Sequence, residues 1–198
     1  MAADAEFAAL RRALTGRVTT ASYFDLNPGM PGPPDNEYSD AAVLVPLIVR
    51  SDGIKCILTK RSRNLAHHAG QIAFPGGRVS AVDAGPLAAA YREAYEEIGL
   101  PVSRIEILGN LPRHRTATGF RIFPFVAAVS DFEPVLQIEE VESIFEVPFG
   151  FLTDPGNFRI ESAIWNGSRR RYYAIPFGPH FIWGATAAIL YGLAQLRR

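Results

Sequence analysis

The sequence predicts an α+β fold in which a mixed β-sheet lies between helices, as in an α/β/α sandwich. Strand-like segments dominate the middle of the 198-residue chain, whereas helical segments are few. The length is sufficient for one domain with a hydrophobic core, and neither an internal repeat nor a second domain is visible. We therefore expect an N-terminal helix and linker over residues 1–40, followed by a single domain over residues 41–198.

The segment before the domain is predicted to contain a short helix. Phe7, Leu10 and Leu14 recur at helical spacing and would form one apolar stripe on a helix over residues 3–15. The stretch that follows, residues 27–36, is rich in proline and glycine, and this composition predicts an irregular linker.

Strands are predicted where short apolar and β-branched runs end at turn-forming residues. Residues 42–50 and 54–59 flank Ser51-Asp52-Gly53 and are predicted to form a β-hairpin. A second hairpin is expected around Asn166-Gly167. The later predicted strands cover residues 71–74, 105–110, 120–130, 158–165 and 169–175.

Three further expectations concern the second half of the chain. Pro124 lacks a backbone N–H, so it is expected at a sheet edge or a bulge. The acidic stretch 139–146 is expected to lead into a short helix, and residues 179–197 are expected to form the last helix. The packed face of that last helix is predicted to contain Trp183, Ala187, Leu190 and Ala194.

Residues 86–98 are predicted to form an acidic helix. Gly85-Pro86 would open it, with Asp83 as a cap or dipole partner, and Gly99 would end it in the left-handed conformation before Pro101. The packing side of this helix is expected to contain Leu87, Ala90, Ala94 and Ile98.

Three carboxylates share the other side of this helix. Glu93, Glu96 and Glu97 fall on one face, and Arg92 has the ion-pair spacing to Glu96. Like charges at this spacing destabilise a helix unless a hard divalent cation such as Mg²⁺ or Mn²⁺ binds them, although a solvated acidic face is the alternative. The glycine-rich turn Phe74-Pro75-Gly76-Gly77 favours the cation, because it lets the backbone approach a metal or phosphate closely.

The composition excludes several other classes of function. A formal net charge of zero argues against nucleic acid or a membrane surface as a general partner. The single cysteine, Cys56, excludes an internal disulfide and is expected to be a buried thiol. We find no apolar run long enough to span a bilayer and no targeting segment, so a cytoplasmic protein is expected.

The acidic helix and the turn before it resemble the Nudix box, G-x5-E-x7-R-E-U-x-E-E-x-G-U, where U is aliphatic. Gly77 matches the first glycine, and the run from Arg92 to Leu100 matches the second half. The middle departs from the pattern. Asp83 stands in place of the first glutamate, and the loop to Arg92 is one residue longer.

A second resemblance lies upstream, in a basic segment that by composition is either a phosphate-binding loop or an ordinary one. The pattern L-L-T-x-R-S-x3-R-x3-G-x3-F-P-G-G precedes the box in the Nudix branch that hydrolyses coenzyme A and its acyl derivatives. The chain matches it in register, except that Ala66 stands where the pattern has its second arginine. The residues that can take the role of this arginine are Arg63, His67 and His68.

The resemblance implies metal-dependent hydrolysis of the pyrophosphate linkage of coenzyme A to 3′,5′-ADP and 4′-phosphopantetheine. It implies that Glu93 and Glu97 bind Mg²⁺ or Mn²⁺, that Glu96 is a third ligand or bridge, and that the Gly77 carbonyl is a further ligand. Arg92 would orient the carboxylates. The bound metal ion would neutralise the negative charge of the pyrophosphate linkage, and a carboxylate would act as the general base that takes the proton from the attacking water.

The remaining roles are open at this level. The general base is either a box glutamate or an acidic residue of the segment 139–142, in which Glu140 is the preferred candidate. The alternative for this segment is the solvated acidic start of a helix, with no catalytic role. His114 faces substrate or lies at a surface strand end. The candidate substrate contacts are Arg61, Ser62, His68 and Gly70.

The substrate is expected to be a small nucleotide of the coenzyme A class. The alternatives are ADP-ribose, a dinucleotide or a nucleoside triphosphate, or a module that binds a nucleotide without cutting it. A monomer and a homodimer are both compatible with the sequence.

Overall fold

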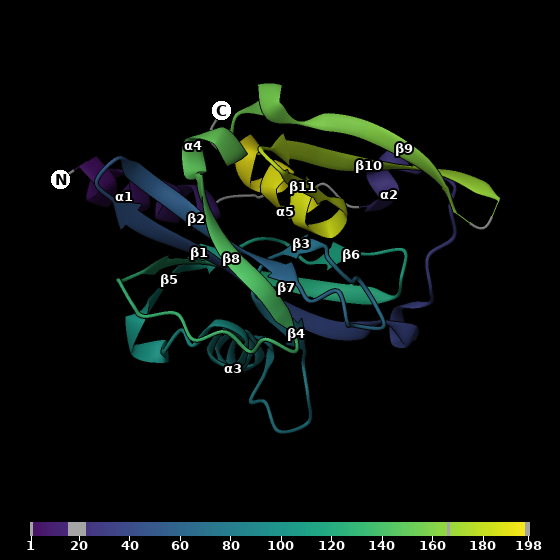
Figure 1. Ribbon diagram of the computed structural model, residues 1–198. Coiled ribbons are helices and arrows are strands. Elements are labelled where there is room, and N and C mark those ends of the chain that lie inside the picture. The colour runs from purple at the N-terminus through teal and green to yellow at the C-terminus, as the bar shows by residue number, and fades with distance from the viewer. Residues whose placement is uncertain (1, 16–22, 166, 197–198) are drawn as a thin grey trace.

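The computed structural model describes residues 2–15, 23–165 and 167–196 (Figure 1). The helices are α1 (Ala2–Thr15), α2 (Tyr23–Leu26), α3 (Pro86–Ile98), α4 (Phe149–Leu152) and α5 (Gly184–Gln195). The strands are β1 (Ser39–Arg50), β2 (Gly53–Arg61), β3 (Ile72–Ala73), β4 (Gly76–Arg78), β5 (Ile105–Asn110), β6 (His114–Arg115), β7 (Phe120–Val129), β8 (Val141–Pro148), β9 (Arg159–Trp165), β10 (Ser168–Phe177) and β11 (His180–Trp183). Single 3₁₀ turns cover Asp35–Glu37, Val102–Arg104 and Pro155–Asn157.

The main sheet is mixed, as predicted. Its central path runs β3-β2-β1-β7-β5, and β4, β6 and β8 pair with β1, β7 and β2 respectively. β1 and β7 are parallel from Ser39↔Phe120 to Ile48↔Val129, whereas β1 and β2 form the predicted antiparallel hairpin. A smaller antiparallel sheet has the order β11-β10-β9 and contains the second predicted hairpin, with Ser168 opposite Trp165.

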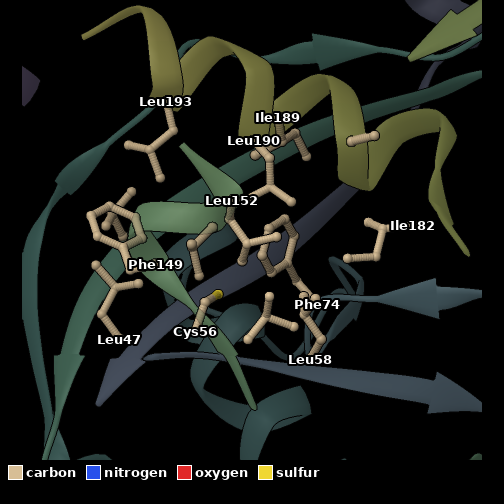
Figure 2. Close-up of a cluster of buried hydrophobic side chains, with 14 of the residues drawn as sticks. Leu47, Cys56, Leu58, Phe74, Phe149, Leu152, Ile182, Ile189, Leu190 and Leu193 are labelled. Carbon is tan, nitrogen blue, oxygen red and sulfur yellow. The ribbon is translucent and has the colours of Figure 1, made fainter. Parts of the chain in front are cut away.

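The main sheet is covered on both faces, so the α/β/α arrangement is confirmed. Helix α3 lies on one face, and α5 with the smaller sheet lies on the other (Figure 1). Alternate residues of β1 serve the two faces. Leu44 and Ile48 pack in the cluster that contains the α3 residues, whereas Val45 and Leu47 belong to the larger core (Figure 2). None of the helices in the described ranges is long and apolar enough to cross a membrane.

Leu190 on α5 offers a direct test of the larger core. Its side chain is fully buried among residues of α4, α5 and the main sheet (Figure 2). We expect Leu190→Ala to lower the free energy of unfolding by about 2–5 kcal/mol, because it removes buried methyl groups and leaves a cavity. Chemical denaturation measures this change. The matched control is Val82→Ala at an exposed site, which should change stability by less than about 0.5 kcal/mol.

The prediction of one helix over residues 179–197 was wrong at its start. Residues 180–183 form β11, which pairs with β10 from Phe177↔His180 to Ala174↔Trp183, and the helix begins only at Gly184. Trp183 is therefore the residue before the helix rather than part of its packed face. Ala187, Leu190 and Ala194 are buried as predicted. A short apolar run before a helix has no periodicity that separates it from the helix, so only pairing with β10 decides its conformation.

The expectation for Pro124 in β7 was also wrong. Pro124 occupies a strand with neighbours on both sides, at the point where the partner of β7 changes from β5 to β6. It needs no donor there, and its carbonyl accepts the N–H of Leu111. As predicted, the acidic stretch leads into a short helix, α4, which begins at Phe149, but the alternative of a solvated helix start is wrong because residues 141–148 form β8 and pair with β2.

Candidate active site

Two adjacent glycines bring the backbone of β4 against α3. The Gly76 N–H donates to Glu97 Oε2 at 3.1 Å, and a Cβ on Gly76 would lie 2.3 Å from the carbonyl oxygen of Ala42. A Cβ on Gly77 would lie 2.4 Å from the carboxylate of Glu93. Backbone therefore excludes a side chain at Gly76, whereas a side chain at Gly77 would require the Glu93 carboxylate to move. The hydrogen bond from Gly76 was not predictable from the sequence, which pointed only to Gly77.

The three glutamates of α3 differ in environment. The residue Glu97 is 2% exposed and the side chain of Glu93 is 15% exposed, whereas the side chain of Glu96 is 55% exposed. Burial raises the pKa of Glu97 to about 7, against the opposing effects of the Gly76 N–H and the Arg61 charge. The negative charges of Glu93 and Glu140 add to this increase. Burial also raises the pKa of Glu93, and the charges of Glu96 and Glu140 reinforce that shift.

Arg92 links three carboxylates on the outer side of the turn. Its guanidinium donates to Glu93 at 2.8 Å, to Glu96 at 2.9 Å, as the four-residue spacing predicted, and to Asp83 at 2.9 Å. Asp83 also accepts from the backbone and hydroxyl of Ser80, and Arg92 holds the pKa of Asp83 well below its usual range. The expectation that Asp83 caps the helix was wrong, because Gly85 is the N-cap residue and no side chain caps it.

The end of β2 and the loop after it contain the predicted substrate contacts, and of these the Arg61 side chain contacts a glutamate of α3. Arg61 Nη1 lies 3.4 Å from Glu97 Oε1, and the backbone N–H of buried Ser62 donates to the carbonyl of Glu140 at 2.8 Å. Gly70 has φ 70° and donates its N–H to the carbonyl of Arg61. His68 is exposed and contacts Gln71 rather than a glutamate.

His114 lies apart from the glutamates. It is 2% exposed, so the alternative of a surface strand end was wrong. Its side chain lines a cavity of about 60 Å³ together with Tyr23, Tyr173 and Gly184, and none of the box residues lines that cavity. Cys56 is fully buried, as predicted, and burial raises the pKa of its thiol.

The donor set around Gly77 fits a divalent metal ion. Within the described ranges no three ligand side chains are gathered into a ready cluster, since Glu96 is turned toward Arg92. Glu93 and Glu97 nevertheless supply carboxylate oxygens beside the Gly77 backbone, where no side chain intrudes. One or two carboxylates completed by water and substrate phosphate are the usual Mg²⁺ ligands. A cation would also relieve the repulsion between these buried carboxylates.

The comparisons with known proteins agree with this geometry. The NUDIX domain family matches residues 39–159, which contain the glycine turn and α3. The chain is 39% identical to the uncharacterized Nudix hydrolase NudL of Escherichia coli K12 over 158 residues, which cover 79% of this chain and 82% of NudL.

A NudL of Shigella boydii serotype 18 matches to the same extent. Among solved structures, a MutT/nudix family protein from Enterococcus faecalis superposes with a TM-score of 0.51 at 15% identity. The superposed region covers 96% of this chain and 71% of the Enterococcus protein, and this similarity concerns the fold alone. The matched domain and the identity to NudL establish that the chain belongs to the Nudix family and is a pyrophosphohydrolase.

Proposed function

We propose that the enzyme hydrolyses the pyrophosphate linkage of coenzyme A or acyl-coenzyme A, giving 3′,5′-ADP and the corresponding 4′-phosphopantetheine. The observation that carries this proposal is the contact between Arg61 and Glu97. Arg61 belongs to the upstream pattern of the coenzyme A branch, and Glu97 belongs to the Nudix box. Two motifs that are 36 residues apart in the sequence therefore meet at one carboxylate.

In this proposal Glu93 and Glu97 hold the metal, with the Gly77 carbonyl as a further ligand and Glu96 as a bridge or third ligand. When bound there, Mg²⁺ or Mn²⁺ would neutralise pyrophosphate charge and polarise the phosphorus. Arg92 orients Glu93 and Glu96 through its hydrogen bonds. Arg61 lies where its guanidinium can leave Glu97 for a substrate phosphate, a bidentate partner that suits arginine.

We propose Glu140 as the general base that takes the proton from the attacking water. Its negative charge adds to the raised pKa of both Glu93 and Glu97, which supports a carboxylate within electrostatic reach of the proposed metal ligands. Backbone hydrogen bonds from Ser62 to its carbonyl and from its N–H to Gln137 fix its position, while its exposure leaves the carboxylate accessible to water. Ser62, His68 and Gly70 are the further proposed substrate contacts.

Product analysis tests the proposal. The purified protein is incubated with coenzyme A, acetyl-coenzyme A, ADP-ribose and a nucleoside triphosphate, each with Mg²⁺ or Mn²⁺, and the products are separated. Release of 3′,5′-ADP from the coenzyme A compounds alone is the expected result. Turnover of ADP-ribose or the triphosphate instead would contradict the assigned substrate but would still agree with metal-dependent hydrolysis of a phosphoanhydride bond.

One observation favours a second candidate, the same chemistry on ADP-ribose, a dinucleotide or a nucleoside triphosphate. Ala66 replaces the second arginine of the coenzyme A pattern in an exposed loop, which removes one phosphate contact. A module that binds a nucleotide without cutting it remains a third candidate. It predicts ligand-induced stabilisation without any product.

Arg61→Ala is expected to lower kcat/KM for the true substrate by about 10–100-fold, chiefly through a higher KM, because it removes a charged hydrogen bond to phosphate. Steady-state kinetics at saturating Mg²⁺ measure this effect. The matched control is Arg104→Ala, since Arg104 is exposed and lies outside both motifs. Equal losses in the two variants would contradict a specific role of Arg61.

A further inference from the structure

A second concave site lies beside the first half of α3. This groove has a volume of about 1040 Å³ and is bordered by α3, the end of β5, β6 and β7. Tyr91 lines it, whereas Glu93 and Glu97 are about 120–160° away from Tyr91 around the helix axis. The groove therefore opens on a different side of α3 from the glutamates, and none of the described residues that line it belongs to the proposed metal site.

Aromatic and basic side chains share one wall of the groove. Arg121, Phe123 and Phe125 are alternate residues of β7, so they share one face of the sheet. Both phenylalanines are half-buried, packing on one side against the core beneath α3. Arg113 and Arg115 line the same groove, and no acidic side chain is among the described residues that line it.

The three arginines are held in place before any ligand arrives. The guanidinium of Arg113 lies 4.9 Å from the ring centroid of Phe123, and this arginine makes no ion pair with any residue in the described ranges. Arg115 pairs with Asp35 at 3.0 Å, and Arg121 pairs with Asp40 at 2.7 Å.

Arg115 and Arg121 are also direct cross-strand partners. Like charges in that position repel, and the ion pairs with Asp35 and Asp40 compensate this repulsion in part; a bound anion would compensate it further. Side chains arranged in this way lose little conformational freedom on binding.

We propose that this groove binds a nucleoside phosphate at a second site, separate from the metal-dependent site. The arginines supply charged donors to the phosphate, and the half-buried ring of Phe125 supplies a surface on which the base can stack, because the ring of Phe123 is already covered by Arg113. The volume is at the upper end of the range for small-molecule sites. This site needs no metal ion, and the inference goes beyond the proposed hydrolysis and does not depend on its substrate.

The test is binding of AMP to the full chain in EDTA, measured by equilibrium dialysis or calorimetry. Arg113→Ala is expected to weaken AMP binding about tenfold, and Arg113→Glu to abolish it, because they remove or reverse a phosphate-binding charge. Arg113 is exposed, so both variants should keep the fold, which circular dichroism verifies. The matched control is Arg104→Glu at an exposed position outside the groove. Binding should be unchanged in this control and in Glu97→Gln.

Several outcomes would overturn the second site. They are the absence of saturable AMP binding, binding that survives Arg113→Glu, and inorganic phosphate binding as tightly as AMP, which would mean an anion patch without a base platform. Loss of binding in Glu97→Gln would assign the nucleotide to the glutamate side of α3. A dimer that dissociates in Arg113→Glu, without AMP binding to the wild type, would instead identify the groove as a subunit interface.

Discussion

Glu97→Gln is expected to lower kcat by about 10²–10⁴-fold, a loss of several kcal/mol in transition-state stabilisation. The substitution keeps the shape of the side chain and an oxygen that can accept the Gly76 N–H, but it removes the charge of the proposed metal ligand. Steady-state kinetics at saturating Mg²⁺ measure the effect. Near-wild-type turnover under these conditions would contradict the assignment of Glu97 to the metal.

The same substitution is expected to stabilise the metal-free protein at neutral and higher pH. Burial raises the pKa of Glu97 from its ordinary value of 4.5 to about 7, so the folded protein retains a proton that the unfolded chain has lost. Stability therefore falls as pH rises from about 4.5 to about 7 and stays lower above that range. Glu97→Gln removes this penalty, which we place at about 1–3 kcal/mol above pH 7.

Denaturation of the metal-free protein as a function of pH checks this second effect. Wild type and variant should converge below pH 4.5 and diverge above pH 7, and added Mg²⁺ should stabilise only the wild type. The matched control is Glu133→Gln, at an exposed acidic position with no assigned role, which should leave turnover unchanged. A variant that is less stable than wild type at pH 8 would show that ionised Glu97 has enough favourable partners to offset its burial.

The elements with strong local signals were predictable from the sequence. Gly99 ends α3 with φ 70°, as a helix followed by Pro101 requires, and Ser51-Asp52-Gly53 closes the β1–β2 hairpin. The element at residues 180–183 was not predictable, because its conformation depends on pairing with β10 rather than on its own sequence. The strands that pair with β7, rather than the residue type, likewise determine that Pro124 lies inside the sheet and not at its edge.

The candidate site likewise contains features that local sequence predicts and features that depend on tertiary packing. Helical periodicity placed Glu93 and Glu97 together, and the spacing of Arg92 to Glu96 predicted their ion pair. Periodicity carries no information on depth, so it could not predict that Glu97 is buried while Glu96 is exposed. The contact of Arg61 with Glu97 depends on how β2 and α3 pack across the sheet, and only the folded chain reveals it.

Alanine at the two adjacent glycines is expected to have two different effects. Gly76→Ala should destabilise the fold by at least about 2–3 kcal/mol, because its Cβ would lie 2.3 Å from the backbone oxygen of Ala42, which pairing between β1 and β4 holds in place. Gly77→Ala should leave stability nearly unchanged, because its Cβ meets only the movable carboxylate of Glu93. That carboxylate must shift away from the proposed metal position, so kcat should fall by about 10–100-fold.

Denaturation and steady-state kinetics on both variants separate the two effects, and each variant is the other's control. The substitution adds one methyl group at neighbouring positions, so the difference in outcome depends on what the methyl group meets. Backbone of a paired strand cannot yield without breaking the pairing, whereas a carboxylate at the end of a flexible side chain can rotate. Full activity in Gly77→Ala would mean that Glu93 can move without loss of the metal, and would remove Glu93 from the proposed ligand set.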